Sequence, residues 1–162
     1  MEIYLVEVDA MLNSIVGGIP AVASFKSPLL PGDILSISAN VADLWGGHRS
    51  VNADGVILSH GIPDWGSYRP GTPAPSTVPL YSNAANYIFG IDCLVGSIDN
   101  GLSFFSIGSC YSERILVPSV PELLLFYWGA NNGDTGGVIK FTVEITRRSA
   151  ANSPALSREV TP

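Results

Sequence analysis

A loop between residues 128 and 137 concentrates the side chains best suited to hold a ligand. It reads Trp-Gly-Ala-Asn-Asn-Gly-Asp-Thr-Gly-Gly and contains no apolar side chain after Ala130. Its amide, carboxylate and hydroxyl oxygens come from Asn131, Asn132, Asp134 and Thr135. Oxygens of these kinds suit a hard cation such as calcium, the hydroxyl groups of a sugar, or both. The same residue types also build ordinary turns, so the alternative is a loop without a ligand.

Two runs suited to β-strands flank this loop. Leu123 to Tyr127 is continuously apolar, which predicts a strand covered on both faces. After the loop, Phe141, Val143 and Ile145 alternate with polar residues, which predicts a half-buried strand. The polar residues of this second run are Lys140, Thr142 and Glu144.

Most of the remaining chain predicts strands separated by turns. Glu2 to Asp9 alternates well enough for a first strand, with Ile3, Leu5 and Val8 as its buried residues. Further strands are expected at residues 21–25, 34–39, 56–58, 87–98, 103–107 and 114–117. No segment keeps a period of 3.6 residues, so we expect an all-β chain with about eight to ten strands. This pattern predicts a two-sheet β-sandwich, similar to a jelly roll.

Two segments depart from this pattern. Residues 60–81 contain five prolines, and proline at that density excludes an interior helix or strand, so a long loop is expected there. Residues 147–162 have no periodic apolar face and are expected to form an extended tail. The chain should therefore be one sandwich domain, residues 1–146, with a proline-rich insertion at 60–81 and a C-terminal tail.

The composition excludes several classes of protein. Charged residues make up 14% of the 162, and the net charge of −6 opposes nonspecific binding of nucleic acid, which needs a basic face. The sequence has no run of about 18 apolar residues, so no membrane span is expected. Met1 to Asp9 carries early acids and no basic segment, unlike a secretory signal. We expect cytoplasmic synthesis and action outside the cell or on a particle surface.

Six short segments together resemble a known family. They are Leu-Pro-Gly-Asp-Ile-Leu-Ser-Ile (30–37), Ala-Asp-Gly-Val (53–56), Cys-Leu-Val-Gly-Ser-Ile-Asp-Asn-Gly (93–101), Phe-Ser-Ile-Gly (105–108), Glu-Leu-Leu-Leu-Phe-Tyr (122–127) and the Asn/Asp/Gly loop before Phe-Thr-Val-Glu-Ile (141–145). In their order and spacing they resemble the PA-IL-like galactophilic lectins, over most of Val6 to Thr146. The resemblance implies a small β-sandwich that binds one calcium ion at its end, with galactose hydroxyls completing the coordination and no covalent change.

The resemblance also implies a set of site residues. The metal loop falls on residues 131–135, so Asn131, Asn132, Asp134 and Thr135 would be calcium ligands. A backbone carbonyl near Leu44 or Trp45 would add a ligand from a distant loop. His48 lies where the family places a sugar-contacting imidazole, and Asp134 and Asn132 would also contact the sugar. The alternative for His48 is a solvated loop histidine.

One departure from the family weakens the metal site. The family carries an aspartate directly after the Leu-Leu-Phe-Tyr strand, where this chain has Trp128 and Gly129. Asp134 is then the only carboxylate of the loop, and calcium affinity falls with the number of charged ligands. We expect the side chains of Trp45 and Trp128 to lie in the core.

Other candidate residues give weaker signals. Trp65, in the proline-rich insertion, could stack on the apolar face of a sugar or anchor a neighbouring subunit. Cys93 and Cys110 cannot form a disulfide framework, and buried free thiols are expected. The sequence has neither a Gly-x-Ser-x-Gly nucleophile turn nor a His-Glu-x-x-His zinc motif, so no enzyme is expected.

Two classes of function therefore fit the sequence. The first is a calcium-dependent, galactose-type carbohydrate-binding module used in adhesion. The second is a structural or decorating component of a phage virion or other extracellular assembly that uses a lectin-like sandwich. Either class suits a homo-oligomer or a place in a larger assembly, with a galactoside or a neighbouring subunit as partner.

Overall fold

The described part of the chain is built from β-strands. The computed structural model describes residues 1–40, 42–45, 80–82, 87–90, 93–117, 119–130 and 136–148. Its strands are β1 (Glu2–Asp9), β2 (Ser14–Val16), β3 (Ala21–Leu29), β4 (Ile34–Ala39), β5 (Leu80–Ser82), β6 (Ile88–Gly90), β7 (Cys93–Ser97), β8 (Phe105–Ser106), β9 (Cys110–Arg114), β10 (Val120–Ala130) and β11 (Val138–Thr146). Within those ranges, no helix is long and apolar enough to cross a membrane.

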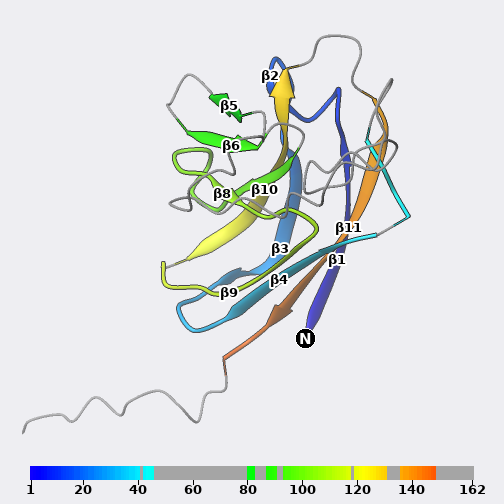
Figure 1. Ribbon diagram of the computed structural model, residues 1–162. Helices are drawn as coiled ribbons and strands as arrows, with labels where there is room; N and C mark the ends of the chain where they lie inside the picture. The colour runs from blue at the N-terminus through cyan, green and yellow to red at the C-terminus, as the bar shows by residue number, and fades with distance from the viewer. Residues whose placement is uncertain are drawn as a thin grey trace, which may run out of the picture.

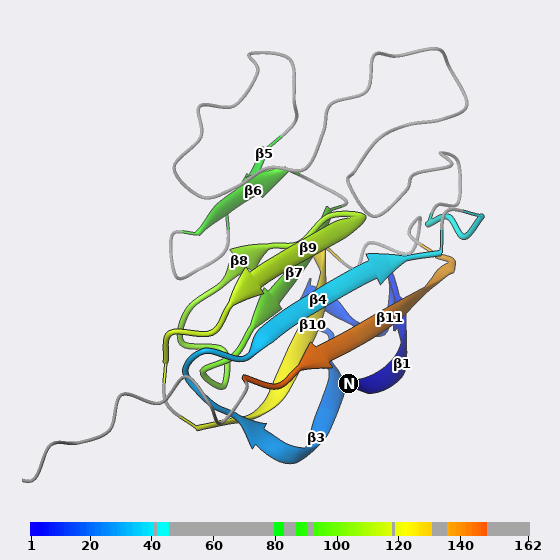
Figure 2. The ribbon, with the colours of Figure 1, turned by 90° about the horizontal axis from the view of Figure 1, so that it is seen from below.

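Two sheets pack face to face, as the sequence predicts (Figures 1 and 2). The first sheet has the order β1-β11-β4-β9, and all its pairs are antiparallel. The second has the order β2-β10-β7-β8, and β3 also pairs with β10. The early residues of β10 lie antiparallel to β3, and its later residues lie parallel to β2. The predicted all-β sandwich is therefore confirmed.

The core between the sheets follows the alternation of the strands. Phe141, Val143 and Ile145 on β11 are at most 1% exposed, whereas Lys140, directly before Phe141, is exposed and Thr142 and Glu144 between them are half-buried. Leu35 and Ile37 on β4 fill the same layer. Alternate side chains of a strand point to opposite faces, so each of these strands contributes one apolar face to the core.

Strand β10 is buried on both faces, which confirms the prediction for its continuous apolar run. Leu123, Leu125 and Tyr127 belong to the core between the sheets. Phe126 and Trp128 point the other way, into a second cluster that includes Phe89 of β6 and Phe104. The Trp128 ring meets the Phe89 ring edge-on, with centroids 4.7 Å apart and planes at 90°. This packing places Trp128 inside the strand and not in the following loop.

The buried face of β1 differs from the prediction. Ile3 and Leu5 are 53% and 81% exposed, so the prediction that they are buried is wrong. The prediction is confirmed for Val8, which is fully buried, and Val6 points into the core beside it. Tyr4, Val6, Val8 and Ala10 alternate along the chain and point to the same side, so this side of β1 offers a longer apolar face than the side that carries Ile3 and Leu5. Tyr4 is half-buried and packs edge-on against Phe25.

Several strand boundaries also differ. The ninth strand begins at Cys110 and ends at Arg114, whereas the sequence predicted residues 114–117. Beyond Arg114 the chain still bonds to the β3–β4 turn, because the N–H of Ile115 donates to the carbonyl of Asp33 at 2.8 Å. Cys93 is buried and Cys110 is exposed, with no disulfide at either, so the expectation that both thiols are buried is wrong for Cys110. The predicted strand 56–58 lies outside the described residues.

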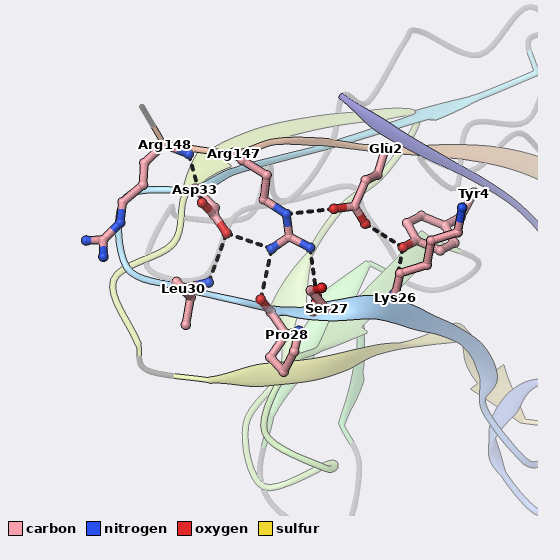
Figure 3. A network of polar contacts seen from close by, with 9 residues as sticks. All are labelled: Glu2, Tyr4, Lys26, Ser27, Pro28, Leu30, Asp33, Arg147 and Arg148. Atoms are coloured by element: carbon pink, nitrogen blue, oxygen red, sulfur yellow. Dashed lines mark hydrogen bonds and ion pairs between the residues drawn. The ribbon is translucent and has the colours of Figure 1, made fainter. Parts of the chain in front are cut away.

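A polar network around Arg147 closes one end of the sandwich (Figure 3). Arg147 follows β11, and its Nε donates to Oε1 of Glu2 at 2.8 Å. Its Nη1 donates to Oδ2 of Asp33 at 2.8 Å and to the carbonyl of Pro28, and its Nη2 donates to the carbonyl of Ser27. One guanidinium therefore joins the start of β1, the end of β3 and the β3–β4 turn to the end of β11.

Asp33 is the buried partner in this network. It is 2% exposed, and burial alone would raise the pKa of its carboxyl. The backbone N–H groups of Arg148 and Leu30, together with Arg147, outweigh burial and hold the pKa of Asp33 below its ordinary value. The hydrogen bond from Arg147 likewise lowers the pKa of Glu2, with help from the Tyr4 hydroxyl. The network requires both carboxylates to be charged.

We expect Trp128→Ala to lower the free energy of unfolding by about 3–5 kcal/mol, because it removes a fully buried ring from the second cluster. Leu5→Ala is the matched control, since Leu5 is 81% exposed, and its effect should stay within about 0.5 kcal/mol. Chemical denaturation of both variants measures the difference. Equal losses would contradict the described burial.

Asp33→Asn should lower stability by about 1–3 kcal/mol at neutral pH, because hydrogen bonds to a charged carboxylate are weakened. The folded pKa of Asp33 lies below its unfolded value, so its charged form stabilises the fold above about pH 4. That contribution disappears as the pH falls through the folded pKa. The stability of the wild type should therefore fall more steeply in acid than that of the variant.

Urea denaturation over a series of pH values measures these slopes. Glu7→Gln removes an exposed carboxylate from β1, outside the Arg147 network. The stability of this variant should fall in acid as steeply as that of the wild type. Parallel pH profiles for Asp33→Asn and the wild type would show that the network does not depend on the charge of Asp33.

Candidate functional site

The predicted metal loop connects the two sheets at one end of the sandwich. Strand β10 of the second sheet ends at Ala130, and β11 of the first sheet begins at Val138. Gly137 is held beside the end of β1, because its carbonyl accepts a hydrogen bond from the N–H of Ala10 at 3.1 Å. The oxygen-rich segment 131–135 itself lies outside the described residues.

A second segment meets β11 at the same end. The N–H of Asn40 donates to the carbonyl of Lys140 at 2.9 Å, and the N–H of Lys140 donates to Oδ2 of Asp43 at 2.9 Å. Asp43 Oδ1 also accepts a hydrogen bond from the Asn40 side chain. These bonds hold residues 42–45 beside the start of β11, although 97 positions separate Asp43 from Lys140 in the sequence.

Trp45 anchors this second segment in the core, which confirms the prediction for its side chain. It is 1% exposed, and its Nε1 donates to the carbonyl of Val8 at 3.1 Å. Its ring meets that of Tyr127 edge-on at 5.1 Å and lies 6.4 Å from that of Phe141. The side chain therefore touches both sheets just below the end where the loops emerge. The calcium ligand proposed for this segment is a backbone carbonyl and stays a prediction.

The other predicted site residues stay predictions as well. Asn131, Asn132, Asp134, Thr135, His48 and Trp65 all lie outside the described residues. Within the described ranges, no three His, Cys, Asp or Glu side chains gather as they would around a metal ion. The described carboxylates near this end bind backbone N–H groups: Asp43 accepts from Lys140, and Asp9 accepts from Met11 and Leu12, both at 2.8 Å.

Trp128 explains one departure from the family that the sequence resembles. The position that carries an aspartate in the family lies here at the end of β10, and its tryptophan is fully buried against Phe89 and Phe104. A carboxylate at this position would enter an apolar cluster without a partner, which is costly. The tryptophan therefore supports the packing of β6 on the second sheet.

Sequence reasoning did not identify the arginines near the end of β11. Arg147 and Arg148 were expected to begin the tail, but the structure describes both of them bonded to Asp33. The available signal was an arginine pair directly after an alternating strand. Its partners, Glu2 and Asp33, lie more than a hundred residues earlier in the chain, so the pairing could not be read from the sequence.

Comparisons with known proteins give little to set beside this geometry. No protein-family model and no curated protein matches the sequence. One solved structure with a similar chain is described as the EclA N-terminal domain, a PllA-like lectin. The two chains are 19% identical with a TM-score of 0.44, and the match covers 90% of this chain and 97% of the other. At these values the fold assignment rests on the sheets described above and not on the likeness.

We expect Asp43→Ala to lower the free energy of unfolding by about 1–2 kcal/mol, because it removes the acceptor for the N–H of Lys140. Glu7→Gln is a suitable control, since the side chain of Glu7 meets the exposed Nζ of the same residue at 3.8 Å and the substitution leaves the backbone pairing in place. That surface pair should contribute less than about 0.5 kcal/mol. Thermal or chemical denaturation compares the two, and a larger loss for Glu7→Gln would contradict the assignment.

Proposed function

We propose that this protein is a non-catalytic, galactose-type carbohydrate-binding module whose site is completed by calcium. The site would lie at the end of the sandwich where residues 42–45 and 131–135 emerge. The observation that carries the proposal is the hydrogen bond from the N–H of Lys140 to Asp43, which brings the flanks of both segments together. This meeting is what a calcium ion shared by the two segments would require.

The chemistry of the loop supports the same proposal. Asn131, Asn132, Asp134 and Thr135 offer amide, carboxylate and hydroxyl oxygens, which are the ligands that calcium accepts. A backbone carbonyl of residues 44–45 would add an oxygen from the second segment. His48 would donate to a sugar hydroxyl. With one carboxylate in the loop, we expect calcium affinity to be modest and a bound sugar to contribute to the coordination.

A second candidate function is a structural role on a virion or another extracellular particle. One observation favours it: Ile3 and Leu5 are 53% and 81% exposed on β1, an edge strand of the first sheet, and Met1 just before β1 is 82% exposed. Apolar side chains in a row on an edge strand favour contact with another subunit. A particle protein of this kind would also be able to bind glycans, so the two roles are compatible.

Calorimetric titration of the full chain tests the carbohydrate proposal. We expect methyl galactoside to bind in the presence of excess calcium and not in the presence of EDTA. Asp134→Asn should weaken calcium binding about tenfold or more, because it removes the one charged ligand of the loop. Glu7→Gln, with the same change of charge at an exposed site, should bind calcium as the wild type does.

Thermal melting gives an independent readout. A ligand specific for the folded state raises the melting temperature by mass action, so calcium and galactoside together should raise it more than calcium alone. If neither ligand binds or stabilises the protein, the carbohydrate proposal fails. Concentration-dependent assembly in sizing experiments, weakened by Leu5→Ser, would then support the structural role.

A further inference from the structure

A groove lined by arginines lies at the end of the sandwich where β11 terminates. It has a volume of about 320 Å³ and lies between the β3–β4 turn and the ends of β9 and β11. Among the described residues, its charged lining side chains are those of Arg114, Arg147 and Arg148, with no carboxylate. The protein as a whole carries a net charge of −6, so the positive charge of this groove is opposite in sign to the net charge of the protein.

The three arginines differ in their partners. Arg147 is occupied, because its guanidinium contacts Glu2, Asp33 and two backbone carbonyls. Arg114 and Arg148 are exposed, and neither guanidinium has a hydrogen bond or an ion pair to any residue in the described ranges. Figure 3 shows the guanidinium of Arg148 apart from the network that holds its backbone. Two positive charges of the groove are therefore without a counter-charge in the described part of the chain.

The stem of Arg148 is positioned by its surroundings. Its N–H donates to Oδ1 of Asp33 at 2.9 Å, which fixes the backbone. Gly32 lies against the side chain, and a Cβ built on Gly32 would come within 3.2 Å of Cδ of Arg148. Gly32 also has a φ of +97°, a conformation that favours glycine. The turn therefore provides a space that the arginine stem fills.

We propose that this groove binds a tetrahedral oxyanion, a sulfate or phosphate group carried by a larger ligand. Guanidinium groups present several N–H donors in a fixed plane, a geometry that matches the oxygens of such anions. Thr146 lines the groove as well and adds a hydroxyl donor. The volume lies within the range of small-ligand sites, so the groove also has room for the group that carries the anion.

This site is separate from the proposed carbohydrate site. Arg147 follows the last residue of β11, whereas Gly136 and Gly137 precede its first residue. The two candidate sites therefore lie at opposite ends of one strand. Anion binding should not require calcium, and the two proposals can fail independently.

Calorimetric titration of the full chain with sodium sulfate and with sodium phosphate tests the proposal, against sodium chloride at equal ionic strength. We expect saturable binding of at least one of these oxyanions by the wild type. Arg114→Gln and Arg148→Gln should each weaken it about tenfold, because each removes a charged donor. Lys140→Gln changes the charge equally at an exposed position near the other end of β11 and should bind as the wild type does. Asp134→Asn should also leave the affinity unchanged.

Further arms separate the two sources of the anion. Methyl sulfate and methyl phosphate present each group as a monoester, and the tighter of the two identifies the ligand class. Because both arginines are exposed, circular dichroism and melting should show that the glutamine variants stay folded. Absence of saturable binding by the wild type overturns the proposal. Equal affinity of the wild type and both arginine variants overturns it as well.

Discussion

The ion pair between Arg147 and Asp33 is the contact on which the rest of this architecture depends. It joins a buried carboxylate in the β3–β4 turn to a guanidinium at the end of β11, and Glu2 at the start of β1 completes it. Removal of one partner from a buried pair leaves an uncompensated charge, which is far more costly than a lost surface contact. The other oxygen of the same carboxylate, Oδ1 of Asp33, accepts a hydrogen bond from the N–H of Arg148 and holds its backbone at the mouth of the arginine-lined groove. The carboxylate of Asp33 thus both closes this end of the sandwich and positions the backbone beside the groove.

The opposite end of the sandwich is organised by packing as well as by polar contacts. Trp45 inserts between the sheets, and Asp43 ties its segment to the first residues of β11. Aromatic rings of Trp45, Tyr127 and Phe141 therefore pack against one another beneath this end of the sandwich. On the other face of β10, Trp128 packs against Phe89 in the second cluster.

The sequence predicts some parts of this fold well, and the reasons are local. The alternation of Phe141, Val143 and Ile145 and the continuous apolar run of β10 both reflect the period of a strand, and both were confirmed. In β1 both faces carry apolar residues, so period alone could not select the buried one. The Arg147 contacts and the Asp43–Lys140 link were not predictable from local pattern, because their partners lie about a hundred residues apart. For the candidate site, the family resemblance suggested which segments meet, and their side chains stay predictions.

Strand β10 has a consequence for how motion is distributed in the molecule. It has neighbouring strands on both edges and packed side chains on both faces, so its amides cannot reach solvent by a small local opening. Hydrogen exchange at these amides should require unfolding of the whole domain. Exchange rates in the middle of β10 would then report any ligand that stabilises the native state, at whichever end of the sandwich it binds.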